Sequence, residues 1–115
     1  MAGSLAGRTI VLAGGSGGLG SATAQLLGAE GARLVVSYRA NRERAEALSS
    51  IAALVQADLS KAEDRTRLLD AAPEIYGLVV FAGDPARVAD PSKLEAALAD
   101  SYRVNAAGPL LMARE

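Results

Sequence analysis

Four short apolar runs alternate with amphipathic segments along the chain, and this alternation constrains the fold more than any other feature. The runs are TIVLA, ARLVVSY, IAALVQA and GLVVFAG, at residues 9–13, 32–38, 51–57 and 77–83. They are rich in aliphatic side chains and show no polar alternation, which is typical of strands buried on both faces of a parallel sheet. The sequence therefore predicts four buried strands.

The segments between and after these runs carry helix signals. Gly31 fits the position just beyond a helix C-terminus, and Asn41 is a suitable N-cap. Ser60 stands three residues before a glutamate, which is the pattern of a capping box. The predicted helices cover residues 21–30, 42–50, 64–72 and 90–115, the last with Pro91 at its first position and an interruption at Gly108-Pro109.

Strand and helix therefore alternate with short connections, which predicts an α/β fold. Right-handed crossovers and a reversal after the third strand give a Rossmann-like parallel sheet of order 3-2-1-4 with helices on both faces. At 115 residues the chain is predicted to form a single domain, residues 1–115.

Composition excludes several classes of function. The 12 basic and 13 acidic side chains leave almost no net charge, so no electrostatic surface for nucleic acid or an anionic membrane is expected. The chain has no Cys and no His, which excludes disulfides and thiolate or imidazole metal sites. No apolar run has the length of a membrane span, and a cytoplasmic protein is predicted.

The junction between the first strand and the first helix is unusually rich in glycine, in the stretch LAGGSGGLGSA from Leu12 to Ala22. Glycine permits a tight turn and lets bare backbone approach a ligand, and the helix that follows directs unpaired N–H groups at that ligand. A diphosphate suits such a site. We therefore predict that the loop binds a dinucleotide through Gly14, Ser16, Gly17, Gly18, Leu19 and Gly20.

Glycine spacing alone does not identify the class of nucleotide site. Three patterns fit the same loop: Gly15-x-Gly17-x-x-Gly20, Gly14-x-x-Gly17-x-x-Gly20 and Gly14-x-x-x-Gly18-x-Gly20. A P-loop is excluded, because no Gly-Lys-Ser/Thr follows.

The stretch VLAGGSGGLGSATAQLLGAEGARLVVSYR, with the later segments ADLS, VVFAG and YRVNAAGPLLMARE, resembles the short-chain dehydrogenase/reductase family. The resemblance covers nearly the whole chain. It implies that Asp58 and Leu59 contact the adenine, that Ala82 and Gly83 line the cofactor, and that Asn105 is the family's catalytic asparagine. Two positions depart from the family pattern: Ala13 replaces its usual threonine, and Phe81 replaces its asparagine.

The end of the second strand predicts which dinucleotide is bound. An NAD site needs a carboxylate there to bind the ribose 2′-hydroxyl, but the chain has Ser37, Tyr38 and Arg39. A guanidinium forks well onto a phosphate, so NADP is favoured over NAD, with all three residues at the site. Arg42 and Arg44 are interpreted as solvated charges. One feature opposes NADP, since Gly17 stands where many NADP-using relatives carry a second basic residue.

Pro109 gives Asn105 a second reason for interest. Proline has no N–H, so the carbonyl four residues earlier, that of Asn105, loses its helical donor if the helix continues. In the family this carbonyl holds a water in a proton relay. The alternative is that Asn105 caps a new helical turn.

The sequence lacks the serine and the Tyr-x-x-x-Lys that perform hydride transfer in the family, whose members are about twice as long. We therefore interpret it as the NADP-binding, N-terminal part of an oxidoreductase acting on a carbonyl or alcohol substrate. Alternatives are a stand-alone nucleotide-binding module and an interaction module. The fourth strand has an apolar open edge, which predicts pairing with a second copy or with a complementary C-terminal half.

Overall fold

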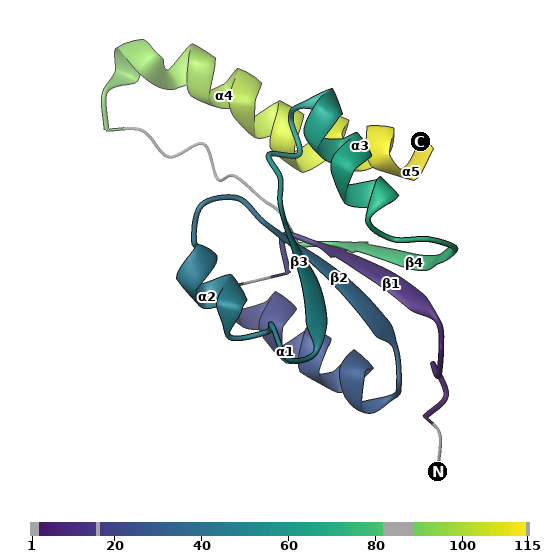
Figure 1. Ribbon diagram of the computed structural model, residues 1–115. Coiled ribbons are helices and arrows are strands. Elements are labelled where there is room, and N and C mark those ends of the chain that lie inside the picture. The colour runs from purple at the N-terminus through teal and green to yellow at the C-terminus, as the bar shows by residue number, and fades with distance from the viewer. Residues whose placement is uncertain (1–2, 16, 82–88, 115) are drawn as a thin grey trace.

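The computed structural model describes residues 3–15, 17–81 and 89–114. Parallel strands alternate with helices (Figure 1). The elements are β1 (Thr9–Ala13), α1 (Gly18–Ala29), β2 (Arg33–Tyr38), α2 (Arg42–Glu46), β3 (Ala52–Gln56), α3 (Ala62–Asp70), β4 (Ile75–Val80), η1 (Pro91–Lys93), α4 (Leu94–Tyr102), η2 (Arg103–Ala107) and α5 (Gly108–Arg114).

The sheet has the predicted order, β3-β2-β1-β4, and all three strand pairs are parallel. Helices α1 and α2 cover one face, and α3, α4 and α5 lie on the other (Figure 1). This confirms the predicted Rossmann-like fold class. Because successive strand residues point to opposite faces, β1 supplies both layers of the core.

The two layers are separate hydrophobic clusters. Val11 and Ala13 point into the layer under α3 and α5, which includes Leu68 and Met112. Ile10, Leu12, Ala24, Leu34, Val36 and Leu48 form the layer under α1 and α2. Every residue of β1 is buried, which explains why the first strand reads as an uninterrupted apolar run.

Two of the predicted helix signals are confirmed, and one is wrong. Gly31 has φ +88° just after α1, and the Asn41 side chain accepts from the Arg44 N–H at 2.9 Å. Ser60 does not cap α3, whose N-cap is Lys61. The Ser60 hydroxyl instead donates to Asp58 Oδ1 at 2.7 Å, because the nearby carboxylate is a stronger acceptor.

The predicted interruption at Gly108-Pro109 does not break the helix. A π-helical turn, η2, joins α4 to α5, and the Gly108 N–H donates to the Arg103 carbonyl five residues earlier. The wider turn carries the helical path up to the proline, which has no N–H to donate. The condition under which Pro109 frees the Asn105 carbonyl, a continuing helix, is therefore met.

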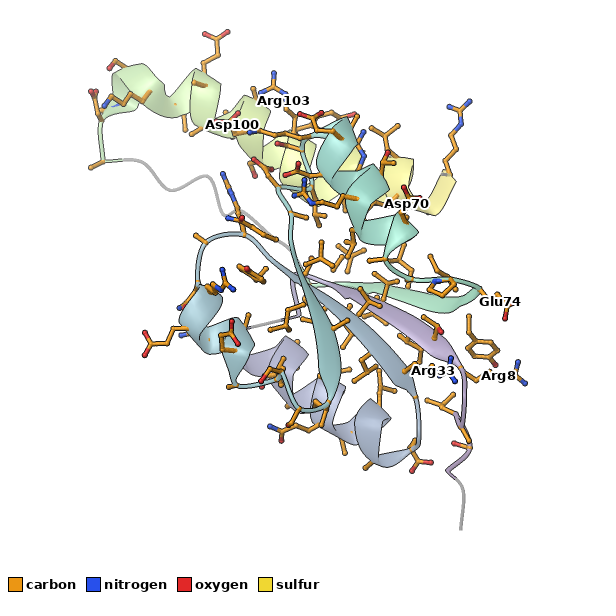
Figure 2. The ribbon with its side chains drawn as sticks, viewed as in Figure 1. Arg8, Arg33, Asp70, Glu74, Asp100 and Arg103 are labelled. Carbon is orange, nitrogen blue, oxygen red and sulfur yellow. The ribbon has the colours of Figure 1, made fainter. Side chains whose placement is uncertain are left out.

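The opposite end of the sheet, where the strands begin, carries a separate polar group. The Arg8 guanidinium carbon lies 4.7 Å from the centre of the Tyr76 ring, in cation–π range. Arg8, Arg33 and Glu74 are labelled together there in Figure 2. No helix among the described residues is long and apolar enough to cross a bilayer.

Candidate functional site

All four strands end at the same edge of the sheet, because they are parallel. β1 ends at Ala13, β2 at Tyr38, β3 at Gln56 and β4 at Val80. In open α/β sheets ligands bind outside this edge, at the point where the strand order reverses. Here the reversal lies between β1 and β4, and the glycine-rich loop follows β1.

The loop begins with a turn that only glycine adopts readily. Gly14 has φ +77°, in the left-handed region. Its N–H donates to the Ser37 hydroxyl oxygen at 2.8 Å, and Ser37 is only 1% exposed. Ser37 was predicted to contact the cofactor. The structure gives it a different partner, because its side chain points from β2 beneath the loop.

Removing the Ser37 hydroxyl tests this support. We expect Ser37→Ala to lower the free energy of unfolding by about 1–3 kcal/mol, because the Gly14 N–H is left without its buried acceptor. Urea unfolding followed by far-ultraviolet circular dichroism measures the change. Ser49→Ala is the control, since Ser49 is exposed and lies in the turn after α2. Equal stability of the two variants would contradict the supporting role.

Close backbone packing explains a second glycine. A Cβ on Gly20 would lie 2.5 Å from the Gly15 Cα and 2.6 Å from its carbonyl oxygen, closer than van der Waals contact permits. The first turn of α1 therefore sits directly on the loop. Gly17 and Gly18, in contrast, have nothing within 4 Å of the position of a Cβ. The bare backbone at the start of α1 thus faces open space.

The end of β2 lies next to the end of β3. Tyr38 is largely buried, whereas Arg39 is exposed. Hydrogen bonds from the Ser60 hydroxyl and backbone N–H lower the pKa of Asp58, and the nearby positive charges of Arg39 and Lys61 lower it further. Burial opposes the shift. Arg39 and an ionised Asp58 therefore occupy the same corner of the site.

Leu59 has a structural position. It is 5% exposed and packs in the layer under α3 and α5, and its carbonyl accepts from Arg65 Nη1 at 3.0 Å. The predicted adenine contact of Leu59 would therefore have to come from its backbone. Among the described residues, no cluster of carboxylates suits a metal ion.

Other predicted positions are only partly described. Ser16, Ala82 and Gly83 lie outside the described residues. Leu19 is in the first turn of α1 and is strongly exposed. Asn105 lies in the π turn η2. On the β4 side, the Phe81 N–H donates to the Ala13 carbonyl at 2.8 Å, which extends the sheet by one residue toward the loop.

Arg44 lies closer to the loop than its interpretation as a solvated charge implies. It is exposed, but it lines a hollow of about 490 Å³ together with Gly17, Gly18, Ser21 and Ala47. A signal for this position was the spacing of α2. Ala45 and Leu48 are buried, so the neighbouring residue is held at the edge of the buried face.

Comparison with known proteins agrees with this architecture. A family described as short chain dehydrogenase matches residues 8–115. Among curated relatives, 3beta-hydroxysteroid dehydrogenase 1 of Eggerthella lenta is 44% identical over 64% of this chain and 31% of its own length. Versicolorin reductase of Emericella nidulans is 31% identical over 96% of this chain and 46% of its own length.

Solved structures give the same result. A short-chain dehydrogenase/reductase from Brucella melitensis superposes with a TM-score of 0.83 at 30% identity, covering 99% of this chain and 52% of that one. A dehydrogenase/reductase from Sinorhizobium meliloti has a TM-score of 0.82 at 31% identity, covering 96% and 48%. The chain spans about half the length of these proteins, or less, and the whole enzyme's activity extends beyond the residues described here.

Proposed function

We propose that this chain, which belongs to the short-chain dehydrogenase/reductase family, is the NADP(H)-binding part of an oxidoreductase. The family binds nicotinamide dinucleotides. Bound NADPH supplies a hydride for reduction of a carbonyl, and the oxidised form accepts one from an alcohol. The chain's own residues bind and orient the dinucleotide.

The observation that carries the proposal is the open backbone at the start of α1. Gly17 and Gly18 leave space beside the first turn, and the N–H groups there have no partner within the helix. The positive end of the α1 dipole favours an anion at this point. The turn at Gly14, which Ser37 holds from below, keeps this backbone in place.

Arg39 supports NADP rather than NAD. It is the exposed residue directly after β2, and no carboxylate occupies the end of that strand to bind a ribose 2′-hydroxyl. Its side chain lies near enough to Asp58 to affect the pKa of that carboxyl group. We propose that Arg39 binds the 2′-phosphate and that Asp58 contacts the adenine.

The substrate side of the site lies toward β4 and η2. We propose that the backbone carbonyl of Asn105, which loses its α-helical donor at Pro109, accepts a hydrogen bond from a water in the family's proton relay. The serine and the Tyr-x-x-x-Lys do not occur in these 115 residues. Hydride transfer therefore requires polypeptide beyond this sequence, and the chain itself binds without catalysing.

Calorimetric titration of the protein with NADP and with NAD tests the proposal. We expect saturable binding of both, with NADP bound about tenfold more tightly, the equivalent of one extra charge-assisted contact. Calorimetry suits a chain without tryptophan, whose intrinsic fluorescence is weak. Absence of heat with either nucleotide would remove the proposed function, and a preference for NAD would remove its NADP part.

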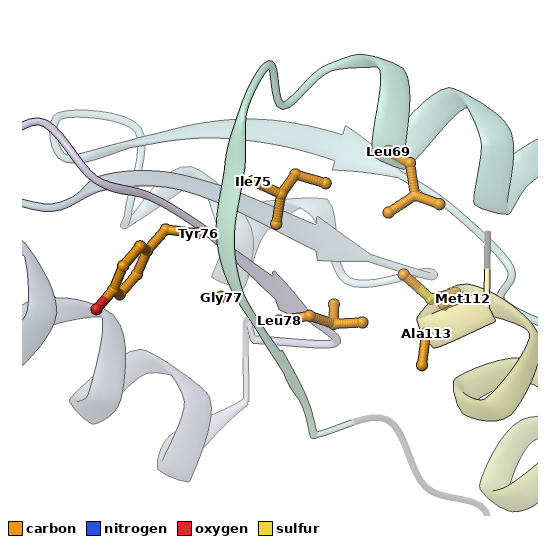
Figure 3. A pocket seen from close by; sticks show the side chains of 7 residues that line it. All are labelled: Leu69, Ile75, Tyr76, Gly77, Leu78, Met112 and Ala113. Carbon is orange, nitrogen blue, oxygen red and sulfur yellow. The ribbon is translucent and has the colours of Figure 1, made fainter.

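A second function, as an interaction surface, is favoured by the outer edge of β4. Among the described residues this strand pairs only with β1. Beside it lies a groove of about 590 Å³, lined by Leu69, Ile75, Tyr76, Gly77, Leu78, Met112 and Ala113 (Figure 3). We infer that a further strand pairs here, from the polypeptide that completes the fold or from a second copy of the chain.

A further inference from the structure

The hollow between α1 and α2 joins the glycine-rich loop to a cation on a different element. Gly17, Gly18 and Ser21 form its α1 side, and Arg44 and Ala47 form its α2 side. The two helices lie on the same face of the sheet (Figure 1). The hollow therefore begins at the bare backbone that faces the proposed diphosphate.

The position of Arg44 is fixed by the structure of α2. The Asn41 side chain accepts from the Arg44 backbone N–H at 2.9 Å and so caps the helix. Ala45 is fully buried and Leu48 is 1% exposed, so both anchor this segment to the core. The stem of Arg44 consequently starts from an ordered helical turn beside the loop.

The two arginines of α2 differ in their partners. Arg42 Nε donates to Glu46 Oε1 at 3.1 Å, and this hydrogen bond is the main reason that the pKa of Arg42 is raised. Within the described part of the chain, the Arg44 guanidinium forms no ion pair. It is the α2 arginine whose charge is not already matched by a carboxylate of its own helix.

From this geometry we infer that Arg44 binds the 2′-phosphate of NADP together with Arg39, and so determines cofactor specificity; the inference rests on the proposed function. Gly17 has no side chain and leaves open space where a basic loop residue could otherwise stand. Arg44 delivers the second positive charge to that space from the opposite wall of the hollow. An exposed guanidinium binds a phosphate without a large desolvation penalty.

The position of the hollow favours the 2′-phosphate over the diphosphate. It lies on the side of the loop toward β2, the strand that Arg39 follows directly and α2 follows after a short turn. The β4 side, on the other flank of β1, is where Asn105 and the substrate are proposed to lie. A dinucleotide with its nicotinamide toward β4 therefore has its adenosine ribose toward β2 and Arg44.

The test compares Arg44→Gln with Arg42→Gln by calorimetric titration with NADP and with NAD. We expect Arg44→Gln to weaken NADP binding about tenfold and to change NAD binding by less than about twofold. Arg42→Gln removes the same charge from the same helix, and we expect it to change either affinity by less than about twofold. Thermal unfolding of each variant verifies that α2 is intact.

Several outcomes overturn the inference, and they are distinguishable. If wild-type protein binds NADP more tightly than NAD but Arg44→Gln does not reduce that preference, Arg44 is not a specificity residue, although the proposed function stands. Equal weakening of both nucleotides places Arg44 at the shared diphosphate instead. Equal effects of the two arginine variants indicate long-range charge only. Failure of wild-type protein to bind either nucleotide removes the proposed function with it.

Discussion

Replacing Gly20 with alanine is expected to destabilise the protein by about 3 kcal/mol, because the new methyl group has no room. Its carbon would lie 2.5 Å from the Gly15 Cα, which is backbone and cannot move aside without shifting the loop. Alanine favours helix over glycine by about 1 kcal/mol, so the steric effect must exceed that gain. Since domains are stable by only about 5–15 kcal/mol, the change is a large fraction of the total.

Gly18→Ala is the matched control. Gly18 is the first residue of the same helix, and nothing lies within 4 Å of the position of its Cβ. We expect its stability to equal or slightly exceed that of the wild type. Urea unfolding followed by circular dichroism compares the three proteins. Equal midpoints for the two variants would show that α1 is not seated on Gly15 as described.

Arg39→Asp is expected to reverse the nucleotide preference. Two charge-assisted hydrogen bonds to the 2′-phosphate contribute about 3 kcal/mol together, so NADP binding should weaken roughly 100-fold. The new carboxylate repels the phosphate and provides an acceptor for the ribose 2′-hydroxyl of NAD. Titration with both nucleotides measures the ratio of the dissociation constants.

Arg42→Asp makes the same change of charge three residues away, and we expect it to leave that ratio within about threefold of the wild type, as long-range effects between exposed charges are screened. Arg39→Asp should also raise the pKa of Asp58 toward its ordinary value, because the nearby guanidinium contributes to lowering it. If NADP affinity did not fall relative to NAD, the assignment of Arg39 would be wrong.

The fold was predictable from sequence because its determinants are local. Apolar runs of strand length, the cap at Asn41 and the glycine at position 31 each act over a few residues. Alternation of such units leaves few possible topologies for a parallel sheet. The family resemblance then rests on several short segments in order, and the match over residues 8–115 confirms it.

Features that depend on distant contacts were not predictable in this way. The hydrogen bond between the Gly14 N–H and Ser37 joins residues 23 positions apart, and no spacing rule connects them. Arg44 is indistinguishable in sequence from its neighbour Arg42 until the packing of α2 against the loop is known. The π turn likewise depends on how α5 packs, since its sequence signal, a glycine before a proline, predicted a break.

That π turn has a consequence for the whole helical segment from Leu94 to Arg114. A wide turn inserts one residue relative to α-helical phase, and each residue of an α-helix advances the azimuth by about 100°. In α4 no side chain is buried, whereas Met112 in α5 is buried in the core layer under that helix. Without the extra residue, the seam that begins at Gly108 would rotate away from the sheet. The insertion thus lets one continuous rod be free along its first half and anchored along its second.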